Sequence, residues 1–424
     1  MKKILTTICA IGLLTACQKD EETQQPVTPA MADRTVIVYM SAENNLSPYS
    51  LDDLSEMKIG AKEVSSNNNL VYFMDRSSTI EKPYIARIRS NMQVDTLYKY
   101  QEDFYNSDPE RFAEVLSRVT ALCPARSYGL VLWGHANGWC IEGDTVAVST
   151  ANAPRRAYGR DRGDDSTTDN NTGKWLNIPS MRMALESLGI KWKFIFCDCC
   201  NMMGAEVAYE LRNVADYLIG SPAEIPGNGA PYDKMAPHFF MQTDNFYEEI
   251  VNDYAEAYPN KLPLSAIQLD KMDTLASVTR QMMPYITEYL QQAEQQSAPL
   301  QDIIYYYSPS GRSNNTNKNM YDMKNVMRAA VDNHAGDAAS EDYAAWETVF
   351  NQAVKIRKTS ETWETNNYNT VRFSDFSANF KAENQGCVSM FFPLSKYQDA
   401  KLKPNESIRQ MAWFYAVGWP EAGW

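Results

Sequence analysis

The sequence contains few of the residues that most often act as catalytic bases or form cross-links. Three of its 424 residues are histidine and eight are cysteine, which is too few for a disulfide scaffold in a chain of this length. Basic blocks are missing, and the formal net charge is −13. A chain with this charge is unsuited to nucleic acid or to an anionic membrane surface, so we expect neither as a direct partner.

Long apolar runs are absent except near the N-terminus. Two lysines precede an apolar run from Ile4 to Leu14, which is too short to span a bilayer and is typical of a signal peptide. The small residues before Cys17 fit a bacterial lipobox. We therefore expect residues 1–17 to be a lipoprotein signal peptide and Cys17 to carry the lipid. An ordinary signal peptide with a chance cysteine is the alternative.

The segment after Cys17, residues 18–33, is polar and acidic and contains proline. It has little apolar surface to bury, so we expect a flexible tether. Its QKDEE start resembles the export signal of surface lipoproteins in Bacteroidota, although a solvated linker has the same composition. We expect an exported monomer that is lipid-anchored to the bacterial envelope, with the outer-membrane surface as its candidate location, and that is otherwise soluble.

Beyond the tether, strand patterns alternate with helix patterns. Short β-branched or aromatic runs predict buried strands at 35–40, 69–74, 128–133, 193–196 and 217–221. Helical spacing and capping residues predict helices at 50–61, 108–122, 180–188 and 203–213. A polar, tyrosine-rich stretch before residue 107 predicts a hairpin. This alternation favours an α/β fold with a mostly parallel sheet flanked by helices.

The second half of the chain has a different pattern. Mainly helical segments are predicted at 245–258, 264–294, 320–333 and 339–357, and strand signals return at 387–392. We therefore divide the mature chain into an α/β domain, residues 34–236, and a mainly helical C-terminal region, residues 237–424. The late strands of this region are expected to pack on the catalytic core.

Reactive side chains follow two of the predicted strands. His135 comes directly after the strand YGLVLW, and Cys200 follows the strand KFIF. Ligand sites in parallel α/β sheets collect beyond the carboxyl ends of the strands, so we expect this imidazole and thiol to face one crevice. The pair is the minimal equipment for nucleophilic acyl transfer. His238 and His334 follow no predicted parallel strand and are interpreted as structural.

Three cysteines compete for the role of nucleophile. Cys197 falls among apolar neighbours, which favours burial. Cys199 and Cys200 lie at the turn into the next helix, where a helix N-terminus would lower the pKa of a thiol, and spacing does not separate them. A zinc or thiol–disulfide site on this cluster is an alternative. Adjacent cysteines seldom ligate one ion, however, and paired CxxC spacing is missing.

Two motifs give the sequence a resemblance to a known family. LVLWGHANGW at 130–139 and the cysteine six residues before EVAYEL at 206–211 resemble the clostripain family of cysteine peptidases, in the caspase, legumain and gingipain clan. The register of the second motif selects Cys200 as nucleophile. Weaker similarities are YMSAENNL at 39–46, SPAEIPGNGAPYD at 221–233, MYDMKNV at 320–326 and VSMFFP at 388–393. The resemblance implies a caspase-like fold and an endopeptidase that cleaves after Arg or Lys with a Cys200–His135 dyad.

The resemblance also implies roles for the neighbouring residues. The backbone N–H groups of Ala136 and Cys200 would form the oxyanion hole. Asp198 would select a cationic side chain, with a helix N-cap as its alternative role. Glu224 and Asn228 would lie in another wall of the substrate pocket.

One departure from the family pattern supports a rival interpretation. Ala136 replaces the glycine that usually follows the histidine, and catalysis then requires a backbone conformation that tolerates a Cβ atom. A catalytically inactive, peptide-binding lipoprotein with the same fold is therefore the alternative function.

The loop between histidine and cysteine, residues 141–175, is polar and contains several basic residues. Because the family matures by cutting itself in this loop, the resemblance implies self-processing, and RRAYG places the cut between Arg156 and Ala157. No cofactor is implied as required. Some relatives use calcium, and oxygen ligands could come from Asp161, Asp164, Asp165 and Asp169.

Overall fold

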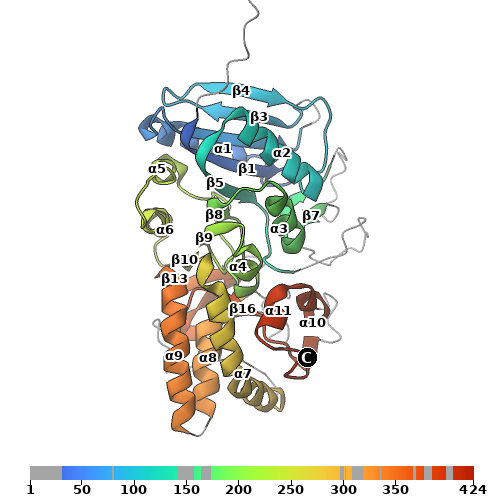
Figure 1. The fold of residues 1–424 in the computed structure, drawn as a ribbon, viewed down its shortest axis with the longest axis vertical. Helices are drawn as coiled ribbons and strands as arrows, with labels where there is room; N and C mark the ends of the chain where they lie inside the picture. Colours follow the sequence, from blue (N-terminus) through green and yellow to red (C-terminus); the bar gives the residue numbers. More distant parts are fainter. Residues whose placement is uncertain are drawn as a thin grey trace, which may run out of the picture.

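The computed structural model describes residues 31–78, 81–140, 157–163, 173–296, 300, 302–307, 319–334, 336–365, 369–376, 384–397 and 404–424. Its largest sheet is built from β1 (Ala32–Ala42), β2 (Asn69–Arg76), β3 (Tyr84–Ile88), β4 (Val94–Lys99), β5 (Ala125–Gly134), β8 (Trp192–Asp198), β9 (Ala215–Gly220), β10 (Leu264–Gln268) and β13 (Val354–Lys358). The strand order is β13-β10-β9-β8-β5-β1-β2-β3-β4. Figure 1 shows this sheet running through the molecule.

The middle of the sheet is parallel and its edges are antiparallel. Strands β2, β1, β5, β8 and β9 pair in parallel, while β3 and β4 form an antiparallel hairpin at one edge and β10 and β13 extend the other. The parallel strands are buried on both faces, as their continuous apolar runs predict. The predicted α/β fold with a mostly parallel sheet is therefore confirmed, and so is the hairpin.

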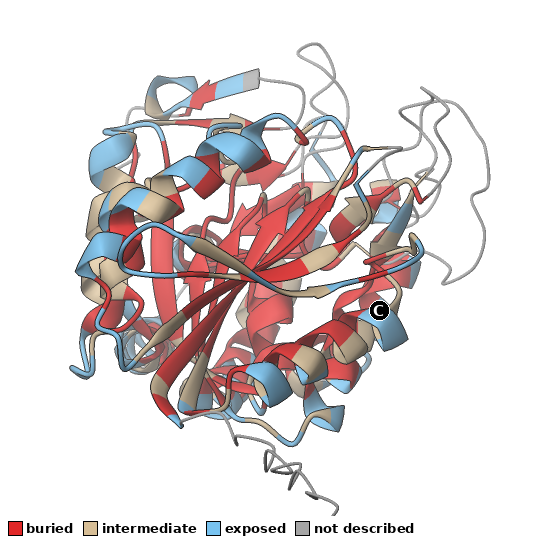
Figure 2. Cartoon of the chain, turned by 90° about the horizontal axis from the view of Figure 1, so that it is seen from above, coloured by how far each residue is buried: buried red, intermediate tan, exposed pale blue. Residues whose placement is uncertain are grey.

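Helices cover both faces of the sheet. One face carries α1 (Tyr49–Gly60), α5 (Tyr232–His238) and α6 (Phe246–Ala257), and the other carries α2 (Pro109–Leu122), α3 (Ile178–Ser187) and α4 (Ala205–Leu211). Alternate side chains of β1 point to opposite faces of the sheet. Val36 and Val38 pack in the core under α1, α5 and α6, and Ile37 and Tyr39 pack in the core under α2, α3 and α4. Figure 2 shows buried strands at the centre and exposed surface on the outer sides of the helices.

Local sequence signals explain where several elements begin. Helix α2 starts as predicted: the Asp108 side chain caps it by accepting bonds from the N–H groups of Glu110 and Arg111, and Pro109 occupies the first turn. Helices α1 and α6 also lie within one or two residues of their predicted bounds.

The C-terminal region contains long helices and small sheets. Besides α6, its helices are α7 (Met272–Glu294), α8 (Met323–Asn333), α9 (Asp337–Ala353), α10 (Pro404–Ser407) and α11 (Ala412–Ala416). Strands β11 (Tyr305–Tyr307), β12 (Asn319–Asp322) and β16 (Ser389–Met390) form one small sheet. Strands β14 (Thr362–Thr365) and β15 (Asn369–Arg372) form an antiparallel pair. In the first half of the chain, β6 (Tyr158–Asp161) and β7 (Lys174–Leu176) form another such pair. None of the helices in the described ranges is long and apolar enough to cross a membrane.

Three predicted helices are wrong at one end, and in one of them residues 320–322, at the start of the helix predicted at 320–333, belong to the strand β12. Residues 264–268, predicted as helix, form β10, and the end of the predicted helix 339–357 forms β13. A short apolar run such as 264–268 fits a strand as well as a buried helix, and pairing with β9 makes it a strand, to which β13 then adds. The central sheet therefore continues past the predicted domain boundary at residue 236.

Candidate active site

The register of two neighbouring strands brings the predicted catalytic pair together. Strands β5 and β8 are parallel, and Trp133 pairs with Asp198. His135 and Cys200 each follow two residues later, so both leave the sheet at the same level. Both side chains line one cavity of about 300 Å³ at this edge of the sheet, together with Asp198.

The histidine loop and the cysteine loop are in contact through a glycine. Gly138 has φ +63°, and a Cβ atom placed on it would lie 2.6 Å from the carbonyl oxygen of Asn201. Asn201 is itself left-handed, with φ 58°, and its side-chain amide donates to the carbonyl of Pro222 at 2.8 Å. Only glycine combines the backbone angle with this close approach, so the HANGW motif is tied to the nucleophile turn.

An asparagine orients the His135 ring. The distance from His135 Nε2 to Asn45 Oδ1 is 2.8 Å, and the Trp175 ring lies 6.5 Å from the imidazole, centre to centre. Because an amide oxygen only accepts, this bond places the proton on Nε2 and makes Nδ1 the basic nitrogen of the neutral ring. Our sequence analysis assigned no role to Asn45, although it lies in the YMSAENNL motif.

Burial separates the two adjacent cysteines. Cys200 is half-buried, lines the cavity, and accepts a bond from the Ile225 N–H at 3.4 Å on its sulfur. Cys197 and Cys199 are fully buried in the core. Burial, followed by the neighbouring Cys197 thiol, raises the pKa of Cys199 well above its usual value. Cys200 is therefore the thiol of this cluster that faces the cavity. A zinc site on this cluster would need the three thiols around one ion, whereas Cys197 and Cys199 are buried in the core.

The helix that follows the nucleophile turn begins later than predicted. Helix α4 starts at Ala205 with Gly204 at its N-cap, so Cys200 lies five residues before its first residue. The prediction that Cys200 lies at a helix N-terminus is therefore wrong, because the influence of that terminus is confined to the first turn.

Asp198 forms the anionic floor of the cavity. Its side chain is 2% exposed and accepts three bonds, from Tyr232 Oη at 2.8 Å, Tyr254 Oη at 2.9 Å and the Ala230 N–H at 3.1 Å. Burial raises the pKa of Asp198, and the three donors oppose that shift. The alternative role as a helix N-cap is wrong, because Gly204 occupies that position.

A second carboxyl group, that of Asp53, lies beside Asp198. A Cβ atom on Gly229 would lie 3.0 Å from Asp198 Oδ2 and 3.1 Å from Asp53 Oδ2. Burial and then the Asp198 charge raise the pKa of Asp53 to about 9, and the Trp133 indole N–H donates to it. Three donors face Asp198 and one faces Asp53 among the described contacts, and this difference favours the negative charge on Asp198 and the proton on Asp53.

The sequence model described as the clostripain family matches residues 38–420. The chain belongs to the clostripain family of cysteine peptidases.

Individual relatives agree with this family membership. The chain is 27% identical over 235 residues to clostripain from Hathewaya histolytica; the match covers 47% of this chain and 41% of that protein, less than half of its length. A secreted C11 cysteine protease from Bacteroides thetaiotaomicron, solved with an irreversible peptide inhibitor, has a TM-score of 0.69 and 25% identity, covering 92% of this chain and all of that one. An inactive zymogen C11 protease from Parabacteroides distasonis has the same fold, with a TM-score of 0.69, 24% identity and coverage of 92% and 99%.

The alanine that departs from the clostripain pattern adopts an ordinary conformation. Ala136 is not among the described non-glycine residues with positive φ, whereas Gly134 has φ +139°. Ala136 pairs with Tyr158, and the bonds of this bridge run from the Asn137 N–H to the Ala157 carbonyl and from the Gly159 N–H to the His135 carbonyl, both at 2.8 Å. The bridge therefore leaves the Ala136 N–H out of its two bonds, and the extra Cβ strains no backbone angle.

The other predicted site residues of this clostripain-family chain differ in their position relative to the cavity. Glu224 lines the cavity, as does Glu364 of β14, and the backbones of these two residues form an antiparallel β-bridge. Asn228 is exposed and is not among the lining residues. Ala157 is fully buried. Cys17, Arg156, Asp164, Asp165 and Asp169 lie outside the described residues.

Proposed function

We propose that this chain is a cysteine endopeptidase that cleaves peptide bonds after Arg or Lys. The observation that carries the proposal is the shared cavity: Cys200, His135 and Asp198 line the same 300 Å³ space. A thiol, an imidazole and a buried carboxylate in one pocket supply a nucleophile, a proton carrier and a cation-selective contact.

Substrate recognition would begin at Asp198. An Arg or Lys side chain that enters the cavity meets this carboxylate and the tyrosine hydroxyls around it, and Glu224 and Glu364 add negative charge to the wall. Since Asp198 is 98% shielded from water, the charge-assisted bond to a guanidinium or ammonium group forms in a weakly screened environment. The same shielding disfavours neutral side chains, which would leave the carboxylate without a cationic partner.

Catalysis would then follow from the dyad. The Cys200 thiol passes its proton to Nδ1 of His135, the sulfur attacks the scissile carbonyl carbon, and the backbone N–H groups of Ala136 and Cys200 stabilise the oxyanion. His135 delivers a proton to the leaving amine as the C–N bond breaks, which leaves a thioester on Cys200. Water hydrolyses the thioester, and the imidazole accepts the proton that this water loses. Asn45 keeps the ring oriented throughout.

Fluorogenic peptides test this proposal directly. We expect release of fluorophore from peptides ending in Arg or Lys, and a kcat/KM at least about 100-fold lower for matched peptides ending in Gln or Leu. Cys200→Ala should remove activity, whereas Cys199→Ala, its matched neighbour, should retain it. Equal cleavage by the Cys200→Ala variant would reject the proposed nucleophile.

Self-processing in the 141–175 loop belongs to the same proposal, with the cut between Arg156 and Ala157. Two observations support this site. The peptide bond follows the basic residue Arg156, and the Ala157 carbonyl accepts a hydrogen bond from the histidine loop. N-terminal sequencing of the incubated chain should find a fragment that begins at Ala157. Its formation should cease in Cys200→Ala, and a first cut elsewhere would move the proposed site.

Export and anchoring complete the proposal. The Bacteroides thetaiotaomicron relative is described as secreted, and the lipobox of this chain supports lipidation at Cys17 and attachment to the envelope as a monomer. Metabolic labelling with a fatty-acid analogue should mark the wild-type chain and leave Cys17→Ala unlabelled. Labelling of the variant would contradict the anchor.

A further inference from the structure

The charged side chains that line the active-site cavity are not all acidic. Asp198, Glu224 and Glu364 contribute carboxyl groups to its lining, and Arg160 contributes a guanidinium group. Among the described residues that border this space, Arg160 is the one lysine or arginine. The proposed binding of a basic substrate side chain uses the carboxyl groups, so it gives the guanidinium no role.

The order of the strands places Arg160 on the histidine side of this cavity. Neighbouring strands of the sheet follow the order β9-β8-β5-β1, and Glu224 follows β9, Cys200 follows β8 and His135 follows β5. Strand β6, which carries Arg160, contacts β5 and β1. The Arg160 carbonyl accepts a bond from Asn44 Nδ2, just after β1, at 2.8 Å. From one side of the cavity to the other, the order is therefore acidic wall, nucleophile, imidazole and guanidinium.

Close backbone contacts fix β6 beside the histidine. The Gly159 N–H donates to the His135 carbonyl at 2.8 Å. Gly159 has φ +68°, and a Cβ atom on it would lie 3.2 Å from Ser41 Oγ, so β6 packs tightly against the end of β1. The Arg160 side chain then runs past Gly173, where a Cβ atom would lie 3.2 Å from its Cγ and 3.3 Å from its Nε. The half-buried Arg160 side chain is therefore packed along the β6–β7 pair.

Strand β7 adds an aromatic ring to the same wall. Trp175 lines the cavity, and its ring lies 6.5 Å from the imidazole of His135, centre to centre. Lys174, the preceding residue, is not among the lining residues, and its Nζ lies 3.9 Å from the centre of the Tyr105 ring. The β6–β7 pair therefore presents one guanidinium and one indole to the cavity, next to the catalytic imidazole.

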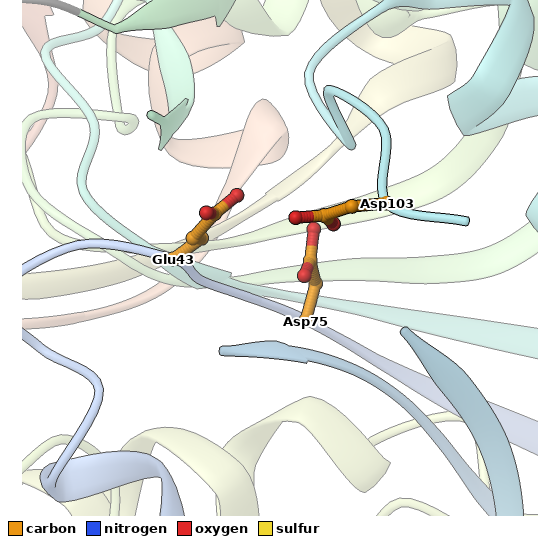
Figure 3. A group of neighbouring side chains, drawn as sticks. All are labelled: Glu43, Asp75 and Asp103. Atoms are coloured by element: carbon orange, nitrogen blue, oxygen red, sulfur yellow. The ribbon is translucent and has the colours of Figure 1, made fainter. Parts of the chain in front are cut away.

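The acidic side chains near the ends of β1 and β2 do not extend the acidic wall to this side of the cavity. Carboxyl oxygens of Glu43, Asp75 and Asp103 lie within 4.8 Å of one another, and Figure 3 shows the three groups gathered together. None of the three lines the cavity, and the side chain of Asp161, which follows Arg160, is fully buried. Among the described lining residues, the histidine side of the cavity therefore carries positive charge.

The chemistry of the reaction determines which part of a substrate would meet this side. In the proposed mechanism His135 gives a proton to the leaving amine, so the nitrogen of the residue after the scissile bond lies beside the imidazole. The residue before the bond directs its side chain toward Asp198, on the side of Cys200. The substrate beyond the leaving amine would therefore continue toward Arg160 and Trp175.

We propose that Arg160, with Trp175 beside it, binds a carboxylate on the part of the substrate that follows the cut. The carboxylate is an Asp or Glu side chain at the first or second residue after the bond, or a C-terminus at that distance. A guanidinium pairs with a carboxylate through two parallel hydrogen bonds and repels a basic side chain in the same place. This inference rests on the proposed peptidase function and adds a substrate class to it: a basic residue before the cut and an acidic group after it.

Internally quenched, amidated peptides test the preference when they differ only in the residue after Arg, which is Glu, Gln or Lys. We expect kcat/KM of the wild-type chain to be about fivefold higher for Glu than for Gln, and lowest for Lys. The ratio should shrink between about 50 and about 500 mM KCl, because salt screens a half-exposed ion pair. Peptides that end two residues after the cut, with a free or an amidated C-terminus, distinguish a terminal carboxylate from a side chain.

Variants of Arg160 separate recognition from a structural role, because the ratio of two peptides within one variant is insensitive to a general loss of folded protein. Arg160→Gln should bring the Glu-to-Gln ratio to about one, and Arg160→Glu should reverse the preference in favour of Lys. Arg126→Gln is the matched control: it removes the same charge from a side chain that is 69% exposed and outside the cavity, and should keep the wild-type ratio.

Peptide binding to Cys200→Ala, measured by fluorescence anisotropy, makes the test independent of cleavage. The Glu peptide should bind about fivefold more tightly than the Gln peptide, and the added Arg160→Gln change should remove the difference. A chain that cleaves after Arg but treats Glu, Gln and Lys alike would overturn this subsite and leave the proposed function intact. A chain that cleaves none of these peptides, yet binds the Glu peptide more tightly through Arg160, would contradict the proposed function and keep the subsite.

Discussion

At the scale of single residues, the charge on Asp198 makes a sharp prediction. Asp198→Asn keeps the size of the side chain but removes the charge that a cationic substrate would meet. We expect kcat/KM for Arg-ending peptides to fall about 100-fold, the range for losing a shielded charge-assisted bond. Peptide hydrolysis under second-order conditions measures it.

Asp53→Asn is the matched control for Asp198→Asn. Because the shared proton resides on Asp53, replacing this carboxyl by an amide should cost less than about tenfold. A larger loss in Asp53→Asn than in Asp198→Asn would contradict our placement of the charge.

Asn45 makes a second prediction at this scale. Asn45→Ala removes the acceptor that holds His135 Nε2 at 2.8 Å. We expect kcat to fall about 10- to 100-fold, with KM changed less than about threefold and a shifted pH profile of kcat/KM, since the ring loses its fixed tautomer. Asn228→Ala, at an exposed position outside the cavity, should remain within about twofold of wild type. An unchanged pH profile in Asn45→Ala would contradict the proposal that Asn45 fixes the tautomer of His135.

The residues that the sequence identified are those whose position follows from strand ends alone. His135 and Cys200 were predicted to converge because neighbouring parallel strands end at one edge, and the structure brings them to one cavity. Choosing Cys200 over Cys199 required the family register, since burial is a three-dimensional property. Asn45 and Asp53 could not be predicted, because their contacts depend on how the loop and helix after β1 fold over β5.

At the scale of elements, Glu206 makes the pH dependence of stability testable. It lies in α4, is fully buried, and accepts the Phe391 N–H at 2.7 Å, while its Oε2 atom has no partner. Burial raises its pKa in the folded state to about 7, above the unfolded value of about 4.3. The folded chain therefore binds more protons between these values, and its stability falls as pH rises through that window.

We expect Glu206→Gln to flatten this dependence. Relative to wild type, the free energy of unfolding of the variant should differ little at pH 4.5 and should be larger, meaning greater stability, by on the order of 3 kcal/mol at pH 8. Urea denaturation at several pH values measures it, with exposed Glu256→Gln as control. A difference between wild type and variant that is independent of pH would show that Glu206 does not titrate in this window.

Elements with local signals were predicted well, and elements decided by pairing were not. The Asp108 cap fixed the start of α2, and β-branched runs fixed β1 and β2. The runs at 264–268 and 354–358 are short, and they become strands only by pairing in the folded sheet, the first with β9 and the second with β10. This pairing depends on strands that are distant in the sequence, so no short stretch of sequence predicts it.

At the scale of the whole molecule, the two halves of the chain share one sheet and one site. Strands β10 and β13 come from beyond residue 236, Glu364 of β14 lines the cavity, and the Phe391 N–H donates to one oxygen of buried Glu206. A fragment of residues 34–236 would expose the edge of β9 and lose these contacts. We expect it to show no cooperative thermal transition by circular dichroism. A cooperative melt close to that of the full chain would show that the first half is an independent domain.

The most direct test of the account is covalent labelling with a thiol-reactive peptide probe that ends in arginine, followed by peptide mass mapping. We predict one adduct per folded chain on the sulfur of Cys200, none on Cys199, and labelling that slows strongly in Asp198→Asn and in His135→Ala. A folded chain that reacts at a different cysteine, or that reacts equally fast with a probe ending in a neutral residue, would contradict the claim that this cavity is a cysteine-peptidase site selective for cations.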